Sequence, residues 1–299
     1  AWSLVFASEV RGILASGLLP DPRLDPHAVA SMLWNGFTVA PHTAVVGVES
    51  LLPGEAAWFD GAGRLIRRFT YWKMPAAHAG SGADQDELEA ALLDSVQAHM
   101  VSDVPVGVFL SGGVDSSCVA NLAARAGGAV VNSFTLAFNE AERNEGDIAR
   151  QVAQAIGTRH TEVLLTEQDF LARLEPALNS LDQPSFDGLN SYFMSRAVRD
   201  AGFTVALVGS GGDELFGGYS SFRDLPLLHR FNGLMATLPA GSATAAGAAR
   251  LLARLMARQG QAYEPQTRWA KLPDMLAAGA SITDLYQLAY ALFLPANQK

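Results

Sequence analysis

The sequence predicts an α/β protein with a parallel sheet, preceded by a smaller β-rich region. Three observations lead to this prediction. Short apolar runs alternate with helical patterns from Asp84 onward, and such alternation gives a parallel sheet with right-handed crossovers. Two of the apolar runs lead into glycine-rich segments, and the residues before Pro75 carry a hairpin pattern instead. We therefore expect a first region over 1–74, a linker over 75–83 and the sheet domain over 84–299.

The composition is that of a folded chain and restricts its partners. With 299 residues, 49% hydrophobic and 17% charged, the chain is long and apolar enough to bury a core. The 30 acidic and 21 basic side chains give a net charge of −9, which argues against binding to nucleic acid or to an anionic membrane. The single cysteine, Cys118, excludes an internal disulfide framework. Such sparse use of cysteine also predicts a reducing, cytoplasmic compartment. No apolar run is long enough to span a bilayer, and the sequence shows no signal-peptide pattern.

The first region combines a helix with a hairpin. Residues 26–34 have a helical pattern, and Asp25 stands where it can cap the helix. The stretch 45–59 is rich in residues that favour strands, leads to a turn at Asp60-Gly61 and is followed by 65–71, which together predict a hairpin. The linker residues are small and polar and include glycine.

The second region alternates strands and helices. Its first apolar run, 106–110, is typical of a strand buried on both faces. Gly157 and Gly202 follow helical patterns and predict where those helices end, and Thr166 opens a helix with acidic residues in its first turn. The complete set comprises helices over 84–102, 115–126, 145–156, from 166 and over 190–201, strands over 106–110, 130–138, 160–165 and 203–208, and a helical remainder from Tyr219.

The most informative motif follows the first of these strands and reads Ser111-Gly112-Gly113-Val114-Asp115-Ser116-Ser117. Its two glycines let the backbone turn tightly and approach a ligand closely. The helix that begins there offers free N–H groups and the positive end of its dipole, and the serines add hydroxyl donors. These features predict a phosphate-binding loop in which Asp115 holds a magnesium ion that bridges phosphates. The alternative is a Gly/Ser turn with a capping aspartate; a Walker A loop is excluded because no lysine follows the glycines.

A second glycine-rich segment, 208–219, also follows an apolar run and contains Asp213. Loops that follow strands of a parallel sheet gather at one edge, where ligands bind. We therefore expect Asp213 to reach the same phosphates as Asp115 and to give magnesium a second carboxylate. Taken alone, this segment is more often just a turn.

In their order along the chain, these segments resemble the asparagine synthetase (glutamine-hydrolysing) family. The resemblance implies that 84–299 is most of an ATP-pyrophosphatase domain, which is Rossmann-like and of the adenine nucleotide alpha hydrolase type, incomplete at its C-terminus. It also implies that 1–74 is the C-terminal part of a β-rich Ntn-type glutaminase, a class II glutamine amidotransferase domain. The stretches that carry the resemblance are 6–14, 47–54, 71–72, 106–117, 181–187 and 209–219.

What the resemblance implies is a two-step ligase that uses ATP and Mg²⁺. A substrate carboxylate, that of aspartate in the family, forms an acyl adenylate and releases pyrophosphate, and ammonia from glutamine then displaces AMP. Asp115, Asp213 and Ser210 are the implied catalytic residues, and Asp115 and Asp213 also hold the metal. A homodimer is a further expectation from the family. The implied nucleotide-binding residues are Ser111, Gly112, Gly113, Asp115, Ser116 and Ser117 for pyrophosphate, and Leu110, Leu136, Val208 and Gly209 for adenosine.

Parts of the family pattern are missing from the sequence. The N-terminal cysteine nucleophile of the glutaminase is absent, and we expect Cys118, one turn into a helix, to be a small buried core residue instead. The family lysine lies in a Lys-x-Asp-Arg-like segment, and none of Lys73, Lys271 and Lys299 has those neighbours. We expect the sequence to be a piece of a longer chain, so that glutamine hydrolysis is assigned to no residue in it.

The residues of the second glycine-rich segment do not determine which carboxylate is the substrate. Asparagine synthetases often carry an acidic residue where Ser210 stands and a serine where Val208 stands, and a serine does not shuttle protons as a carboxylate does at neutral pH. The alternatives are an amide synthetase for another carboxylate, similar to β-lactam synthetases and lasso-peptide cyclases, and an ATP-binding module without complete catalysis. The six histidines show no metal-ligand spacing and are expected in surface or core roles. Asp182 and Asp187 are expected either to contact substrate or to cap local backbone.

Overall fold

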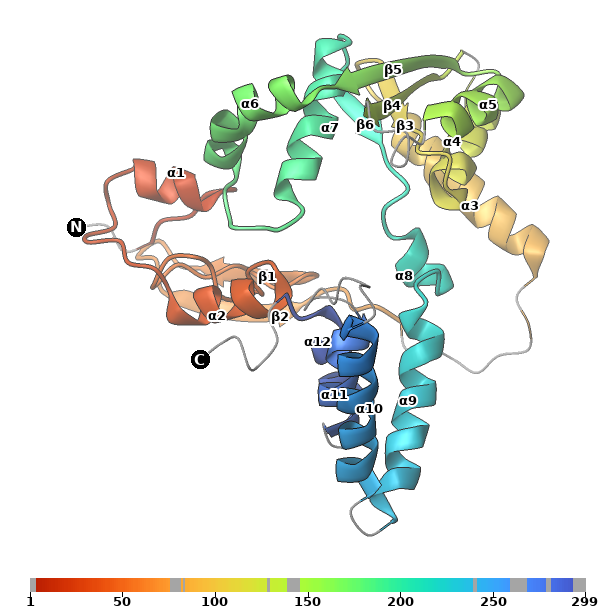
Figure 1. Ribbon diagram of the computed structural model, residues 1–299. Helices are drawn as coiled ribbons and strands as arrows, with labels where there is room; N and C mark the ends of the chain where they lie inside the picture. The colour runs from red at the N-terminus through yellow and green to blue at the C-terminus, as the bar shows by residue number, and fades with distance from the viewer. Residues whose placement is uncertain are drawn as a thin grey trace. The chain divides into compact units, whose positions relative to one another are not determined.

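The computed structural model describes residues 4–75, 82, 84–127, 130–138, 146–238, 241–258, 268–277 and 281–292, drawn in Figure 1 from red to blue along the chain. The predicted linker lies almost wholly outside these residues, as does Lys299. The chain forms two compact units. We call residues 75–181 and 187–218 the sheet unit, and residues 1–74, 182–186 and 219–299 the mixed unit.

The sheet unit is built on four parallel strands, which confirms the predicted fold class. Their order in the sheet is β5-β4-β3-β6. The central strand β3 is buried along its whole length, as its continuous apolar run predicts. In register, Phe109 of β3 lies opposite Phe134 of β4, and Val108 opposite Leu207 of β6. The strands are β3 (Val106–Phe109), β4 (Asn132–Phe138), β5 (Arg159–Leu165) and β6 (Val205–Leu207).

Helices cover both faces of this sheet. Val108 and Leu110 pack with apolar residues of α3, α4 and α5 on one face, whereas Phe109 points the other way and packs with Phe134 and with Val198 of α7. Figure 1 shows α3, α4 and α5 gathered together beside the strands. The helices of this unit are α3 (Gln85–Met100), α4 (Val114–Ala126), α5 (Gly146–Ile156), α6 (Glu167–Ser180), α7 (Gly188–Asp200) and the short α8 (Gly212–Phe216).

Local signals in the sequence fix the helix ends of the sheet unit. The side chain of Asp84 accepts a hydrogen bond from the backbone of α3, and that of Thr166 from the backbone of α6. Gly157 and Gly202 follow α5 and α7 with φ of 84° and 88°, values that favour glycine. The predicted ends of these helices are therefore confirmed, while the predicted first residue of α5, Glu145, lies outside the described part of the chain.

The N-terminal part of the mixed unit contains α1 (Val10–Ala15), α2 (Pro26–Asn35) and a hairpin of β1 (Glu55–Phe59) and β2 (Leu65–Thr70). Asp25 caps α2 by accepting from the backbone of His27, as predicted. The hairpin is confirmed, but its first strand begins at Glu55 rather than near residue 45. Turns at Gly47 and Gly54, both with positive φ, interrupt the stretch that composition alone marks as a strand.

The C-terminal part of the mixed unit is helical, as predicted, with α9 (Ser221–Ala236), α10 (Gly241–Arg258), α11 (Arg268–Ala277) and α12 (Ile282–Tyr290). It forms one compact unit with residues 1–74. Trp34 of α2 packs on a core of Leu225, Met275, Leu285 and Leu288, and the Leu292 backbone donates to the Trp34 carbonyl at 3.0 Å. The spacing of apolar residues predicts a helix, but it does not predict which distant segment of the chain packs against that helix. The assignment of 1–74 and 84–299 to two family domains stays a prediction.

Among the described residues, no helix is both long and apolar enough to cross a membrane.

Candidate functional site

The strand order brings the two glycine-rich loops to one edge of the sheet. The chain runs outward from β3 through β4 to β5 and then returns to β6 on the other side of β3. The carboxyl ends of β3 and β6 therefore flank a topological switch point, the place where open α/β sheets bind ligands. The loop after β3 leads into α4, and the loop after β6 leads into α8.

The loop after β3 is held by its own serines. Ser116 Oγ lies 3.0 Å from Ser111 Oγ and accepts from the Ser111 backbone at 3.2 Å, while Ser117 Oγ donates to the Gly113 carbonyl at 2.7 Å. Gly112 has φ of 80°, which favours glycine. No side chain caps the N-terminus of α4, where Gly113 is the capping residue. The first N–H groups of a helix have no partner within it, so this loop presents donors suited to an anion.

The loop after β6 lies directly against the start of α4. A Cβ atom added to Gly209 would come within 2.8 Å of the Ser116 backbone nitrogen, and one added to Gly212 would come within 2.5 Å of Asp115 Oδ2. The Asp115 carboxylate therefore rests on the Gly212 backbone, immediately before Asp213 in the chain. The Asp213 carboxylate in turn lies close to Gly218, whose N–H donates to the Asp213 carbonyl at 3.0 Å. The two loops predicted from sequence thus touch through the residues next to both aspartates.

Gly212 is required by this contact rather than by its backbone angles. It is not among the glycines with positive φ, so its backbone conformation accepts other residues. We expect Gly212→Ala to displace the Asp115 carboxylate and thereby to weaken binding of Mg-ATP at least about tenfold. This corresponds to a loss of about 1.4 kcal/mol of binding free energy. Gly61→Ala, where an added Cβ would meet nothing within 4 Å, is the matched control. Isothermal titration with Mg-ATP measures both, and equal affinities for the two variants would contradict the expectation.

The residues predicted to line adenosine differ in their exposure. Leu110 is 1% exposed and packs in the core with α3, α4 and α5, so only its main chain is available at this edge. Leu136 on β4 is half-buried, as is Gly209. Val208 is 45% exposed and Ser210 is also exposed, so both are accessible to a ligand. An adenosine role for Leu136, Val208 and Gly209 stays a prediction.

Within the segment 181–187, which resembles a substrate-site segment of the family, Asp182 and Gln183 contact residues of the N-terminal part of the chain. Asp182 accepts from the backbone N–H groups of Val10 at 3.0 Å and Arg11 at 2.8 Å, at the start of α1. Gln183 Oε1 accepts from the Ala44 backbone at 2.9 Å. Of the two roles left open for Asp182, the geometry supports capping. Asp187 precedes α7 and accepts from the Asn190 amide at 3.4 Å.

The predicted burial of Cys118 is wrong, because its side chain is exposed. The buried residues of α4 are Ser116, Ala120, Leu122 and Ala123, and Cys118 is not among them.

Lys271 is a buried residue whose setting the sequence did not indicate. It is 6% exposed and donates from Nζ to the Ala289 carbonyl at 2.8 Å, near the end of α12. It lines a cavity of about 630 Å³ among α9, α11 and α12, together with mainly apolar side chains such as Leu225, Phe231 and Met275. Burial lowers the pKa of its ammonium group from the ordinary 10.5.

This shift predicts a pH dependence of stability. Between the lowered pKa of Lys271 in the folded chain and its ordinary pKa of 10.5, the unfolded chain binds more protons than the folded chain. The free energy of unfolding therefore rises with pH over this range. Lys271→Met removes this dependence. We expect the stability of the wild type relative to Lys271→Met, from urea unfolding at several pH values above neutral, to increase with pH. A difference that stays constant over this range would contradict the prediction.

The fold places the chain among α/β proteins built on a parallel sheet, the class that binds ligands beyond the carboxyl ends of its strands. A family model described as asparagine synthase matches residues 87–294. This match covers more than half of the chain, and the chain belongs to the asparagine synthase family.

Individual relatives agree with this family. A putative asparagine synthetase [glutamine-hydrolyzing] of Mycobacterium bovis is 35% identical over 72% of this chain and 34% of its own length. Asparagine synthetase [glutamine-hydrolyzing] 1 of Bacillus subtilis is 30% identical over 73% of this chain and 34% of its own length. The chain thus spans about a third of the length of these relatives. Among solved structures, an NH3-dependent NAD synthetase from Campylobacter jejuni is 20% identical, with a TM-score of 0.34, over 46% of this chain and 61% of that one.

Proposed function

We propose that the full-length protein forms an amide from a carboxylate, ATP and ammonia, with aspartate as the acceptor and glutamine as the nitrogen donor. Membership in the asparagine synthase family supports the reaction class. The observation that carries the assignment to this chain is the contact of the two glycine-rich loops, in which Gly209 and Gly212 lie against Ser116 and Asp115. The full-length protein is proposed to act in the cytoplasm as a homodimer.

In this proposal the loop after β3 binds pyrophosphate. The uncapped N-terminus of α4 and the residues Ser111, Gly112, Gly113, Ser116 and Ser117 neutralise and position the phosphates. Asp115 and Asp213 supply carboxylates beside them. Mg²⁺ commonly binds one or two carboxylates together with substrate phosphates, so this donor set fits the ion. When bound, Mg²⁺ would offset charge on the phosphates as pyrophosphate departs.

The chemistry proceeds by two substitutions. An oxygen of the substrate carboxylate attacks the α-phosphorus of ATP, the bond to the β-phosphate breaks, and pyrophosphate leaves. The nitrogen of ammonia then attacks the acyl carbon, AMP leaves with the bonding electrons, and a proton is released from nitrogen. The role of this chain's residues is to align these groups in a fixed geometry. Ser210, exposed at the loop after β6, is proposed to lie beside the acyl group during the second step.

A second candidate is amide formation on a carboxylate other than aspartate. Ser210 and Val208 are exposed at this loop, and neither is the residue that asparagine synthetases often carry there. In addition, the relatives are not all named as asparagine synthetases, since Amidase chyE of Penicillium rubens is 28% identical over 74% of this chain and 35% of its own length.

The test is exchange of labelled pyrophosphate into ATP by the full-length protein with magnesium. Exchange that requires aspartate supports the first proposal. Exchange with another carboxylate, and not with aspartate, supports the second candidate. Binding of Mg-ATP without exchange on any of a panel of carboxylates would overturn both and leave an ATP-binding module without complete catalysis.

A further inference from the structure

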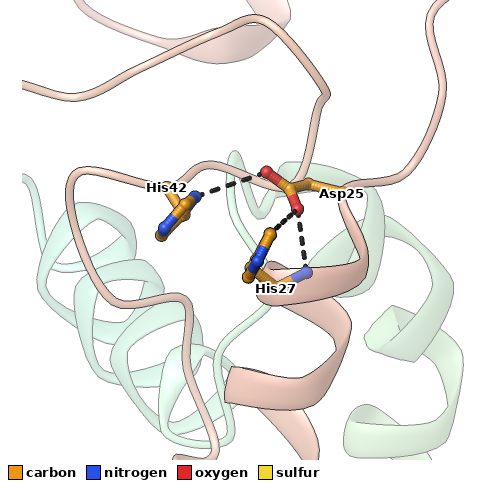
Figure 2. Close-up of side chains that lie close together, drawn as sticks. All are labelled: Asp25, His27 and His42. Atoms are coloured by element: carbon orange, nitrogen blue, oxygen red, sulfur yellow. Dashed lines mark hydrogen bonds and ion pairs between the residues drawn. The ribbon is translucent and has the colours of Figure 1, made fainter.

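Two histidines and an aspartate that lie apart in the sequence meet in the mixed unit. Asp25 and His27 stand at the start of α2, and His42 lies in the loop that follows it. Figure 2 shows the Asp25 carboxylate directed at both rings, with one oxygen toward each. One potential ligand atom from each residue lies within 4.8 Å of those from the other two. The fourteen residues between the histidines hide this arrangement from any short spacing motif.

The distances from the Asp25 carboxylate to the two rings are close to those between ligands of one metal ion. Asp25 Oδ1 lies 3.0 Å from His27 Nδ1, and Asp25 Oδ2 lies 3.5 Å from His42 Nδ1. Two ligands about 2.1 Å from a tetrahedral zinc ion are about 3.4 Å apart. The imidazole rings are stacked with centroids 4.7 Å apart and planes 16° apart. Because a ring nitrogen binds metal in the plane of its ring, coordination requires the His27 ring to turn, and its side chain is 74% exposed and free to do so.

The two other ligands are held by the surrounding backbone. The Asp25 N–H donates to the Ala44 carbonyl at 3.1 Å, and its side chain is only 15% exposed. Next to His42, the Pro41 carbonyl accepts from Ser50 at 2.8 Å, and the buried Thr43 hydroxyl bonds to the Val48 carbonyl at 2.8 Å. Two of the three groups therefore start near their binding positions, which lowers the entropic cost of coordination.

Capping explains only part of the cluster. The cap uses Asp25 Oδ1, which accepts from the His27 N–H at 2.8 Å, and this bond lowers the pKa of Asp25. It leaves unexplained why Oδ2 faces a second imidazole from a different segment. A hydrogen bond from backbone to a ligating carboxylate is, by contrast, a usual supporting contact of metal sites.

We propose that Asp25, His27 and His42 bind a divalent transition metal such as Zn²⁺ through one carboxylate and two imidazoles. Imidazole nitrogen favours zinc, copper and nickel over magnesium, so this site is chemically distinct from the one proposed for Mg-ATP. Three protein ligands leave at least one position on the ion for water or for an external group.

The test titrates the metal-free full-length protein with Zn²⁺ by calorimetry and with Co²⁺ by visible absorption. We expect His27→Ala and His42→Ala each to weaken Zn²⁺ binding by at least about tenfold, because even the loss of a supporting contact typically costs that much. Asp25→Asn keeps an oxygen for the helix cap but loses the charge, and it should weaken binding as well. His99→Ala is the matched control, since His99 is an exposed histidine on α3.

A second measurement keeps the test independent of folding differences among the variants. Zn²⁺ should raise the melting temperature of the wild type and of His99→Ala, relative to the same protein with chelator, and leave that of His42→Ala unchanged. Unaltered Zn²⁺ affinity in the His27→Ala, His42→Ala double variant, or no binding by the wild type, would overturn the proposal.

Discussion

Asp115→Asn is expected to abolish pyrophosphate exchange while leaving the fold intact. The substitution conserves the shape of the side chain that rests on Gly212 but removes its charge. If Asp115 holds the ion that neutralises the departing pyrophosphate, the exchange rate should fall by about 100-fold or more, the usual effect of removing one electrostatic stabiliser. Exchange of labelled pyrophosphate with full-length protein and saturating Mg-ATP measures it.

Asp103→Asn is the matched control for this result. Asp103 is exposed and precedes the same strand, β3, at its amino end, on the opposite edge of the sheet. Its loss should leave exchange unchanged. Comparable losses in both variants would indicate a general effect of charge and would refute a specific role for Asp115.

Phe134→Ala is expected to have the largest effect on stability. Phe134 is 2% exposed, packs with Phe109 and Val198, and makes an edge contact with Phe203 at 5.0 Å between ring centroids. Removing such a ring leaves a cavity between the sheet and α7, and the free energy of unfolding should fall by about 3–5 kcal/mol. The change is measured by urea unfolding of the wild type and the variant, with a spectroscopic signal that reports on the sheet unit.

Phe216→Ala controls for the substitution itself. Phe216 lies in the same unit and is 56% exposed, so its truncation should change stability by only about 0.5 kcal/mol or less. A loss below about 1 kcal/mol for Phe134→Ala would mean that the sheet relaxes into the space and that the ring is not a support of the core.

The sequence predicts the sheet unit well because its signals are local. An apolar run marks β3, and single residues such as Thr166 and Gly157 mark helix ends within one turn of where they act. The glycine-rich loops were also evident, since their residue types and their place after strands are visible without a structure. Their contact follows from topology, because parallel strands put both loops at one edge.

What the sequence did not predict depends on partners far along the chain. The six-residue α1 has no capping side chain of its own, and Asp182 receives its first N–H groups from more than 170 positions away. The meeting of His27 with His42, and the packing of α2 on the C-terminal helices, depend in the same way on tertiary contacts. The sequence does not predict that Cys118 is exposed, because burial differs around a helix and a position in the first turns does not reveal which side faces the core.

The discontinuity of the mixed unit has a consequence for how the protein assembles during translation. Residues 1–74 leave the ribosome before the sheet unit, but Trp34 acquires its apolar neighbours only when α9, α11 and α12 have been synthesised. The sheet unit, complete by Gly218, can close in the meantime. Residues 1–74 therefore finish folding after the sheet unit, although they are synthesised before it, and a nascent chain halted before α9 would expose the apolar side of α2 to chaperones and proteases.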